Sequence, residues 1–209
     1  MKLDQLSVRD FVKELGSDNP TPGGGSVAAL CGALGAALSA MVANLTVERE
    51  KYEQTWKSME EVKKTADELV ARFLDLVQED TDAYQKVMAA FQLPKETEEQ
   101  KASRQTAIEE AMKRAATVPL ETLKASETLV GIAREAVQGG NPNAITDAGA
   151  AVQLANATAV VASYNVRINL SRIKDEAFVA ACEKEVDEIL KRLETLFADV
   201  DGNANIYLA

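Results

Sequence analysis

The sequence predicts an all-α protein: a single-domain antiparallel helical bundle with two central helices rich in alanine and glycine. No segment shows the alternation of apolar and polar residues typical of a strand for more than a few positions, so the pattern does not indicate strands. Two stretches of small, mostly uncharged residues, 27–45 and about 146–170, each follow a loop of glycine, proline or asparagine. The 209 residues contain no internal repeat and no low-complexity linker, which fits one domain with a substantial core.

A short amphipathic helix is expected near the N-terminus. Ser7 and Asp10 stand in the spacing of a capping box, with aspartate in place of glutamate, and Gly16 ends the pattern. The segment 17–25 is a predicted loop, because its two prolines fix φ and remove two backbone N–H donors.

The next predicted helix runs to about Thr46, and Ser26 is its expected N-cap. Residues 27–45 carry no charge, and this uncharged stretch is long enough to match a membrane span. The stretch is mostly alanine and glycine, however, contains Ser39 and Asn44, and has no positive bias at its flanks. We therefore favour a buried central helix and expect no membrane association.

One long helix is predicted over residues 55–91. Its apolar residues recur in alternating steps of three and four, and Leu93-Pro94 ends the pattern. The step missing between Val77 and Tyr84 falls on Asp80. A carboxylate is thus expected on, or next to, the buried side of this helix.

Two helices are predicted between this point and the second glycine-rich loop. Thr97 can cap a helix that runs to about Ala116. Pro119 is then expected in the first turn of a separate helix that ends before Gly139.

The C-terminal third is predicted to hold two more helices. The Asn-Pro-Asn loop at 141–143 leads into the second alanine-rich helix, 146–170. Asp175 is the expected cap of an amphipathic helix to about residue 200, and residues 201–209 are predicted to form a loose tail. Small uncharged helical faces also suit a homodimer, with packing inside one subunit as the alternative.

Composition excludes several function classes. The net charge is −10 and no large cluster of lysine and arginine occurs, so nucleic acid is not an expected partner. The chain has no histidine, which removes Ser-His and Cys-His nucleophiles and the commonest zinc ligand, so no metal site is predicted. Proton transfer near neutral pH would instead need a side chain such as a carboxylate with a shifted pKa.

Cysteine usage and the N-terminus indicate the compartment. Cys31 and Cys182 are interpreted as small buried apolar residues in a reducing environment. The first residues have no apolar stretch of the kind found in a secretory signal, so we expect a cytoplasmic protein.

The loop before the uncharged helix has two interpretations. Gly23, Gly24 and Gly25 let the backbone approach a ligand closely, and free N–H groups at a helix N-terminus bind anions. A tight turn without a ligand fits equally well. The run formally matches the dinucleotide pattern G-x-G-x-x-A, but no strand precedes it and it lacks a P-loop lysine, so neither NAD nor ATP is predicted.

Five polar residues are further candidates, each with a structural alternative. Asp80 is either a desolvated proton-transfer group or a solvent-facing residue. Asn165 and Asn169 lie one turn apart and either bind a ligand or, more commonly for such residues, tie helices together. Arg49 either holds an anionic tail or is solvated, and Asp147 by default complements a helix dipole.

Several motifs, taken together, resemble those of a known family. In chain order they are Asp10-Phe11-Val12, Pro22-Gly23-Gly24-Gly25-Ser26-Val27-Ala28-Ala29, Asp80 with Ala83-Tyr84, Leu93-Pro94-Lys95, Val118-Pro119-Leu120, Gly140-Asn141 and Asn165-Val166-Arg167-Ile168-Asn169-Leu170. Over about residues 6–178 the sequence resembles the cyclodeaminase family, which comprises formiminotetrahydrofolate cyclodeaminases and the related bacterial methenyltetrahydrofolate cyclohydrolases.

The resemblance implies a dimeric, all-helical, folate-binding enzyme with Asp80 as the acid/base residue. The expected reaction converts 5-formiminotetrahydrofolate to 5,10-methenyltetrahydrofolate and ammonia. The alternatives are the cyclohydrolase reaction to 10-formyltetrahydrofolate, or a non-catalytic folate-binding scaffold. The expected substrate-binding residues are Pro22, Gly23, Gly24, Gly25, Ser26, Arg49, Tyr84, Asn141, Asp147, Asn165 and Asn169.

The same resemblance implies which cofactor, substrate and partner protein to expect. No cofactor is expected beyond the tetrahydrofolate substrate, with or without a polyglutamate tail. No formiminotransferase segment is attached, so that partner is expected as a separate chain.

Overall fold

The computed structural model describes residues 2–208, with side chains as far as residue 197, and the described part contains helices and no strand. The all-α prediction is therefore confirmed. The α-helices are α1 (Val8–Leu15), α2 (Gly24–Asn44), α3 (Trp56–Phe91), α4 (Glu98–Gly139), α5 (Ile145–Leu170) and α6 (Glu176–Leu208). Short 3-10 helices cover Leu3–Gln5, Glu50–Thr55 and Pro142–Ala144.

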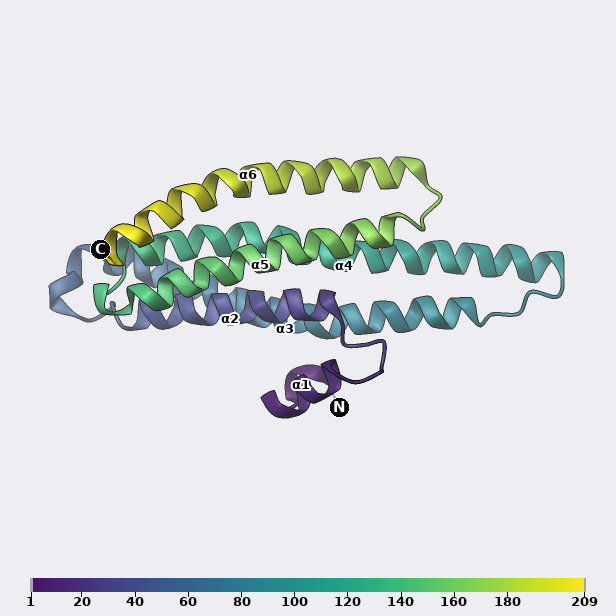
Figure 1. The fold of residues 1–209 in the computed structure, drawn as a ribbon, viewed down its shortest axis with the longest axis horizontal. Coiled ribbons are helices and arrows are strands. Elements are labelled where there is room, and N and C mark those ends of the chain that lie inside the picture. The colour runs from purple at the N-terminus through teal and green to yellow at the C-terminus, as the bar shows by residue number, and fades with distance from the viewer. Residues whose placement is uncertain (1, 209) are drawn as a thin grey trace.

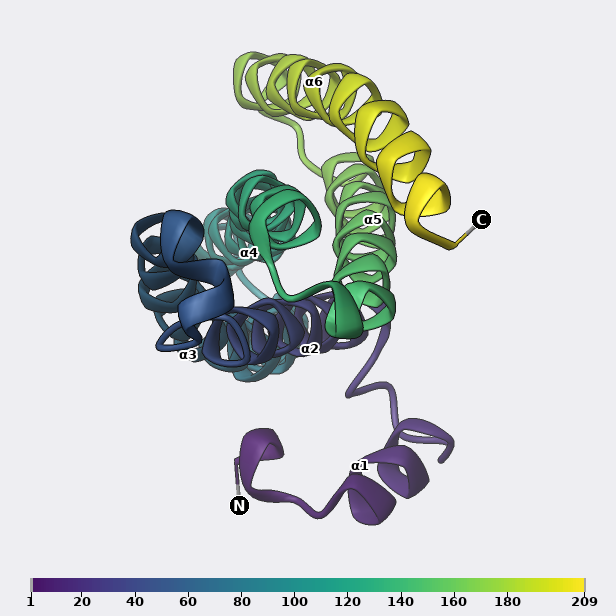
Figure 2. The same ribbon diagram turned by 90° about the vertical axis from the view of Figure 1, so that its left-hand side faces the viewer.

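Helices α2 to α5 form an up-and-down bundle in which each helix packs against two neighbours (Figure 1). α2 packs on α3 and α5, and α4 packs on the same two helices from the other side. α6 covers α4 and α5, while α1 stands away from the bundle beside α2 (Figure 2). α3 and α4 are the longest of the four and extend past the others at one end (Figure 1).

Small side chains let α2 lie close to its neighbours. Ala29, Ala36 and Ala43 are fully buried. A methyl group on Gly32 would stand 2.6 Å from the ring of buried Phe73, so only glycine allows this contact with α3. α2 is also long and apolar enough to cross a membrane, but 61% of its most apolar window is buried inside the fold, as in a core helix.

Two predicted helix starts differ in outcome. The Ser7 hydroxyl accepts a hydrogen bond from the Asp10 N–H, so the predicted cap of α1 is confirmed. Ser26, in contrast, is not the N-cap of α2, because the helix begins two residues earlier and Gly23 occupies that position. Glycine is accepted at an N-cap, and this shift buries the Ser26 side chain inside the bundle.

The prediction of two helices divided near Pro119 is wrong. Thr97 begins α4 with a complete capping box, and the helix then continues through Pro119 to Gly139. A proline inside a helix leaves the carbonyl four residues earlier without its N–H donor. That carbonyl belongs to Ala115, and it accepts a hydrogen bond from Asn169 Nδ2 on α5 at 2.7 Å. At the other end of the chain, α6 continues through Leu208, where the sequence predicts a loose tail from residue 201, and Ala209 lies outside the described residues.

Four alternating charges join α3 to α4 in the middle of the bundle. Glu79 bridges Arg72 and Arg114, with both oxygen-nitrogen distances at 2.5 Å. Glu121 contacts the same two guanidinium groups and closes the ring. The hydrogen bond from Arg72, aided by the two positive charges, lowers the pKa of Glu79. The ring thereby fixes the register of α3 at the residue that precedes Asp80.

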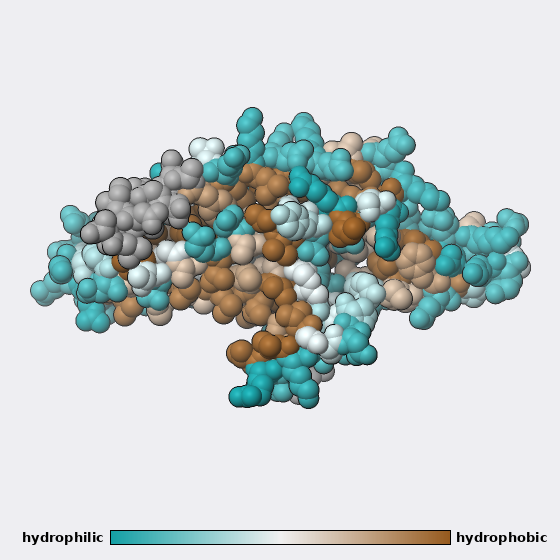
Figure 3. Space-filling model, in the orientation of Figure 1, coloured by the Kyte–Doolittle hydropathy of each residue, from teal (hydrophilic) through white to brown (hydrophobic). Residues whose placement is uncertain are grey.

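Apolar side chains gather on the face shown in Figure 3, over α2 and α5. The large exposed apolar residues here are Leu34 and Met41 on α2, Leu45 directly after it, and Tyr164 and Ile168 on α5. Dimerisation remains a prediction.

Candidate functional site

A cavity of about 270 Å³ lies where the first turn of α2 meets α3, α4 and α5. Each of these helices contributes lining residues, so the bundle itself forms the walls of the cavity. The lining residues are Pro20, Thr21, Gly23, Gly24, Gly25, Asp80, Tyr84, Val87, Met112, Ala115, Asn165, Ile168, Asn169 and Arg172.

Asp80 is the one carboxylate among the described residues that line this cavity. It faces the N-terminus of α2, where Ser26 Oγ lies 3.0 Å from its Oδ2 atom. A methyl group on Gly25 would stand 2.1 Å from Asp80 Oδ1, so the carboxylate rests directly on the glycine backbone. Burial raises the pKa of Asp80, and hydrogen bonds from the Ser26 side chain and backbone offset part of that rise. The structure thus places Asp80 at the cavity wall, as the apolar pattern of α3 predicts.

The Ser26 hydroxyl has a single proton and two acceptors. Its oxygen lies 3.0 Å from the Val77 carbonyl oxygen and 3.0 Å from Asp80 Oδ2. When the hydroxyl donates to Val77, its lone pairs face Asp80 and can accept a proton shared by a protonated carboxyl. Ser26 is fully buried and does not line the cavity, so it contacts the carboxylate from behind.

Asn165 and Asn169 both reach the cavity from α5, as their spacing predicts. Asn165 Nδ2 donates to the Val161 carbonyl on its own helix at 2.8 Å and lies against Gly24. Asn169 Nδ2 donates to the Ala115 carbonyl, so this residue ties α5 to α4. Both residues line the cavity, and each also has an amide oxygen that can accept a hydrogen bond.

Replacing Asn169 by alanine is expected to lower the free energy of unfolding by about 1–2 kcal/mol, because the buried Ala115 carbonyl loses its donor. Pro119→Ala restores a helical N–H to the same carbonyl. Asn169→Ala should therefore cost less in a Pro119→Ala background. Urea unfolding of the wild type, both single variants and the double variant measures this coupling. Equal costs in the two backgrounds would contradict the assigned bond.

The remaining walls are mainly apolar. Tyr84 follows Asp80 by one turn on α3 and is about a third exposed. Beyond it the buried side chains of Val87, Met112 and Ala115 line the cavity. Arg172, just after the end of α5, is the one cation among the described lining residues.

Five of the predicted substrate-binding residues do not line this cavity: Pro22, Ser26, Arg49, Asn141 and Asp147. Pro22 is buried behind the loop. Arg49, Asn141 and Asp147 lie at the opposite end of the bundle, past the C-terminus of α2 or near the start of α5. α2 has 21 residues and is therefore about 30 Å long.

Asn141 has a structural role at that distant end. Its backbone N–H donates to Thr46 Oγ1 at 2.8 Å, and its side-chain oxygen accepts from the Tyr52 hydroxyl at 2.9 Å. Its side-chain nitrogen donates to the Leu45 carbonyl at 3.2 Å. These bonds join the loop after α4 to the loop after α2, so within one chain Asn141 is a tie between loops and not a wall of the cavity.

Among the described residues, no group of three or more acidic or cysteine side chains is arranged to hold a metal ion. The residues that line the cavity supply one desolvated carboxyl group, helix N–H donors, two amides, a phenol and a guanidinium.

The chain is similar to several known proteins over most of its length. The family described as formiminotransferase-cyclodeaminase matches residues 7–188. A methenyltetrahydrofolate cyclohydrolase of Methylorubrum extorquens is 38% identical over 202 residues, which cover 96% of this chain and 94% of that protein. A crystal structure of a formiminotetrahydrofolate cyclodeaminase from Thermotoga maritima superimposes with a TM-score of 0.89 at 29% identity, covering 99% of this chain and 100% of that one.

A fused relative is also similar over nearly the whole chain. The formimidoyltransferase-cyclodeaminase of Rattus norvegicus is 32% identical over 201 residues, or 96% of this chain. The present chain spans only 37% of the length of that relative.

Proposed function

The chain belongs to the formiminotransferase-cyclodeaminase family, and from this premise we propose that its cavity converts 5-formiminotetrahydrofolate to 5,10-methenyltetrahydrofolate and ammonia. Its relatives are named as cyclodeaminases and cyclohydrolases, and the protein is accordingly an enzyme of folate one-carbon metabolism. The observation that carries the specific reaction is the desolvated carboxyl group of Asp80 at the cavity wall.

Asp80 moves the one proton that the reaction must transfer. The formimino group reacts as its cation, whose nitrogen carries two hydrogens. N10 of the folate attacks the formimino carbon held on N5, a new N10–C bond forms as the carbon–nitrogen double bond becomes single, and the N10 proton passes to the carboxylate. The carboxyl group then gives this proton to the formimino nitrogen, whose bond to carbon breaks as ammonia leaves. A carboxyl group with a raised pKa suits this role, since it accepts a proton more readily than an ordinary aspartate and can return it in the second half of the reaction.

The first turn of α2 orients the pterin. The earliest backbone hydrogen bond at this end runs from the Val27 N–H to the Gly23 carbonyl, and a helix leaves its first N–H groups without carbonyl partners. The backbone of Gly24 and Gly25 lines the cavity and donates to a polar edge of the ring system. The amide oxygens of Asn165 and Asn169 accept hydrogen bonds from ring N–H groups on the opposite side.

The cyclohydrolase reaction is the second candidate, and the relative from Methylorubrum extorquens favours it because the match covers nearly all of both chains. In that reaction Asp80 takes a proton from the water that attacks the methenyl carbon. The carbon–N5 bond then breaks, N5 takes that proton from the carboxyl group, the new hydroxyl group releases its own proton to solvent as it becomes the formyl oxygen, and 10-formyltetrahydrofolate forms.

Two substrates separate these reactions. The purified protein is expected to release ammonia from 5-formiminotetrahydrofolate, measured by a coupled ammonia assay, with formation of the methenyl product. Turnover of 5,10-methenyltetrahydrofolate alone, without ammonia release from the first substrate, would replace the cyclodeaminase by the cyclohydrolase. Inertness towards both would contradict both proposals.

We further propose that a formiminotransferase supplies the substrate, since the fused relatives carry that activity in their names.

A further inference from the structure

We propose that Arg172 binds the glutamate carboxylates of the folate substrate and so makes the cavity selective for a glutamylated pterin. This inference rests on the proposed function, because it assigns the remaining part of the same substrate. It is carried by the position of Arg172, by its lack of an ion-pair partner and by the anchoring of its loop.

Arg172 stands at the other end of the cavity from the carboxyl group. α3 and α5 run in the same direction through the bundle (Figure 1). Asp80 and Asn165 both lie against the first turn of α2, at Gly25 and Gly24. Val87 follows Asp80 by seven residues along α3, a rise of about 10 Å. Arg172 follows Asn165 by the same number of residues, the last two in the turn after α5. The polar end of the cavity at Asp80 and its cationic end at Arg172 are therefore separated by a distance that a pterin and a short linker can span.

The wall between these two ends suits an aromatic linker. Val87, Met112 and Ala115 are each less than a tenth exposed and line the cavity beyond Tyr84. A flat apolar group such as the p-aminobenzoyl ring is stabilised against these side chains by the removal of its faces from water. Its carboxamide then leads to the glutamate at the end where Arg172 lies.

The charge of Arg172 is not neutralised within the described part of the chain, where no salt bridge involves it. Arg167, five residues earlier on α5, pairs instead with Asp187 at 2.8 Å. Although the protein has a net charge of −10, an arginine without a carboxylate partner at a cavity gives a local positive charge that attracts anions. A guanidinium group matches a carboxylate through two parallel hydrogen bonds.

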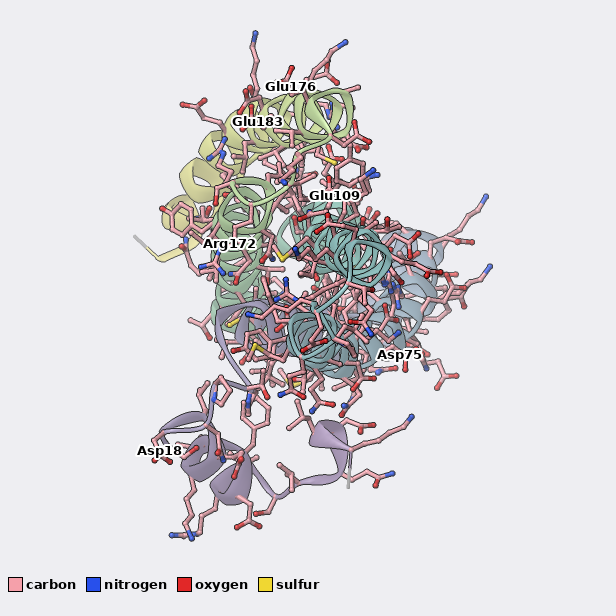
Figure 4. All side chains as sticks on the ribbon, turned by 90° about the vertical axis from the view of Figure 1, so that its right-hand side faces the viewer. Asp18, Asp75, Glu109, Arg172, Glu176 and Glu183 are labelled. Atoms are coloured by element: carbon pink, nitrogen blue, oxygen red, sulfur yellow. The ribbon has the colours of Figure 1, made fainter. Side chains whose placement is uncertain are left out.

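The loop that carries Arg172 is attached firmly to α4. The Glu109 carboxylate accepts from the backbone N–H groups of Lys174 and Asp175, both at 3.0 Å. Lys113 bonds to the Asp175 carboxylate at 2.6 Å. Figure 4 shows Arg172 beside α5 and Glu109 on α4. These bonds hold the backbone around Arg172 in place before a ligand binds, which reduces the ordering cost of binding.

The test compares Arg172→Gln with Arg167→Gln, a matched loss of charge in the last turn of α5. Each protein is assayed on the tetrahydrofolate substrate that the wild type turns over and on the corresponding tetrahydropteroate, which has no glutamate. Arg172→Gln is expected to raise KM about tenfold for the glutamylated substrate, with kcat and the KM for the pteroate unchanged. Arg167→Gln should change neither KM.

Equal KM values for wild type and Arg172→Gln on the glutamylated substrate would overturn the assignment. An equal rise on both substrates would overturn it as well, because the loss would then be independent of the glutamate.

A binding measurement separates this inference from the proposed reaction. Calorimetry with 5-formyltetrahydrofolate, a non-reacting probe, and with its pteroate counterpart gives both affinities without turnover. If the wild type is inert as an enzyme, the proposed function fails alone, and weaker binding of only the glutamylated probe to Arg172→Gln still supports the anchor. Equal binding of that probe to both proteins, or no binding to the wild type, contradicts it.

Discussion

Replacing Asp80 by asparagine is expected to reduce turnover on the order of 100- to 10,000-fold while making the folded protein more stable. The amide cannot carry the proton between the two folate nitrogens, and it keeps nearly the shape of the carboxylate. The gain in stability arises because burial raises the pKa of Asp80, so that the folded state pays for holding the ionised carboxylate at neutral pH.

The pH dependence of that gain has a definite sign. Below the ordinary aspartate pKa, near 3.8, Asp80 is protonated in both the folded and unfolded states, and the wild type and Asp80→Asn differ little for this reason. As the pH rises, the unfolded carboxyl group ionises first, so the wild type loses stability relative to the variant. The difference becomes constant above the raised pKa of the folded state.

Thermal melts at several pH values, with kcat at the pH of maximum activity, measure both effects. Asp82→Asn is the matched control, because Asp82 is an exposed carboxylate on α3 that bonds only to Gln78 among the contacts described. Asp82→Asn should keep wild-type turnover and should not show the pH-dependent gain in stability expected for Asp80→Asn. Retained turnover in Asp80→Asn would show that the proton carrier lies elsewhere, and a lower melting temperature than wild type at pH 7 would contradict the desolvation argument.

Gly25→Ala is expected to have the second largest effect, a loss of about 100-fold or more in kcat/KM. The added methyl carbon would lie 2.1 Å from Asp80 Oδ1 and 2.6 Å from its Cγ, so the carboxylate must leave its position on the helix N-terminus. A displacement of this size removes the alignment on which proton transfer depends. The backbone itself tolerates alanine in a first helical turn, so the bundle is expected to remain folded.

Gly131→Ala is the control for this substitution. A methyl group at Gly131 meets nothing within 4 Å, and the residue lies inside α4 away from the lining residues. Activity should be unchanged and helicity, measured by circular dichroism, retained in both variants. Full activity in Gly25→Ala would mean that Asp80 works from another position.

The sequence predicted the helices well where long periodic patterns decide the structure. The apolar pattern of α3 correctly located Asp80 because a helix keeps its phase over two turns, even where one apolar residue is missing. The division at Pro119 failed because the local rule against proline omits a donor from elsewhere. Asn169, fifty residues later in the chain, bonds to the Ala115 carbonyl, and no local pattern contains that contact.

The lengths of α2 and α5 already separate some of the predicted binding residues from the glycine loop. Arg49 follows a helix of 21 residues that begins at the glycine loop, so a single straight helix already places it about 30 Å away. The same reasoning separates Asp147 from Asn165 on α5. Conversely, Arg172 follows Asn165 and Asn169 at helical spacing, three residues after Asn169. This spacing predicts that Arg172 lies on the same side as the two asparagines, which face the cavity.

The placement of Ser26 has a consequence for the energy of the catalytic step. Its oxygen sits at equal distance from the Val77 carbonyl and from Asp80, so a rotation of one hydrogen atom satisfies either the ionised or the neutral carboxyl group. The Ser26 hydroxyl therefore has a hydrogen-bond partner in both charge states of Asp80. Such a site has a small reorganisation energy, because its dipoles are already in place for both ends of the proton transfer.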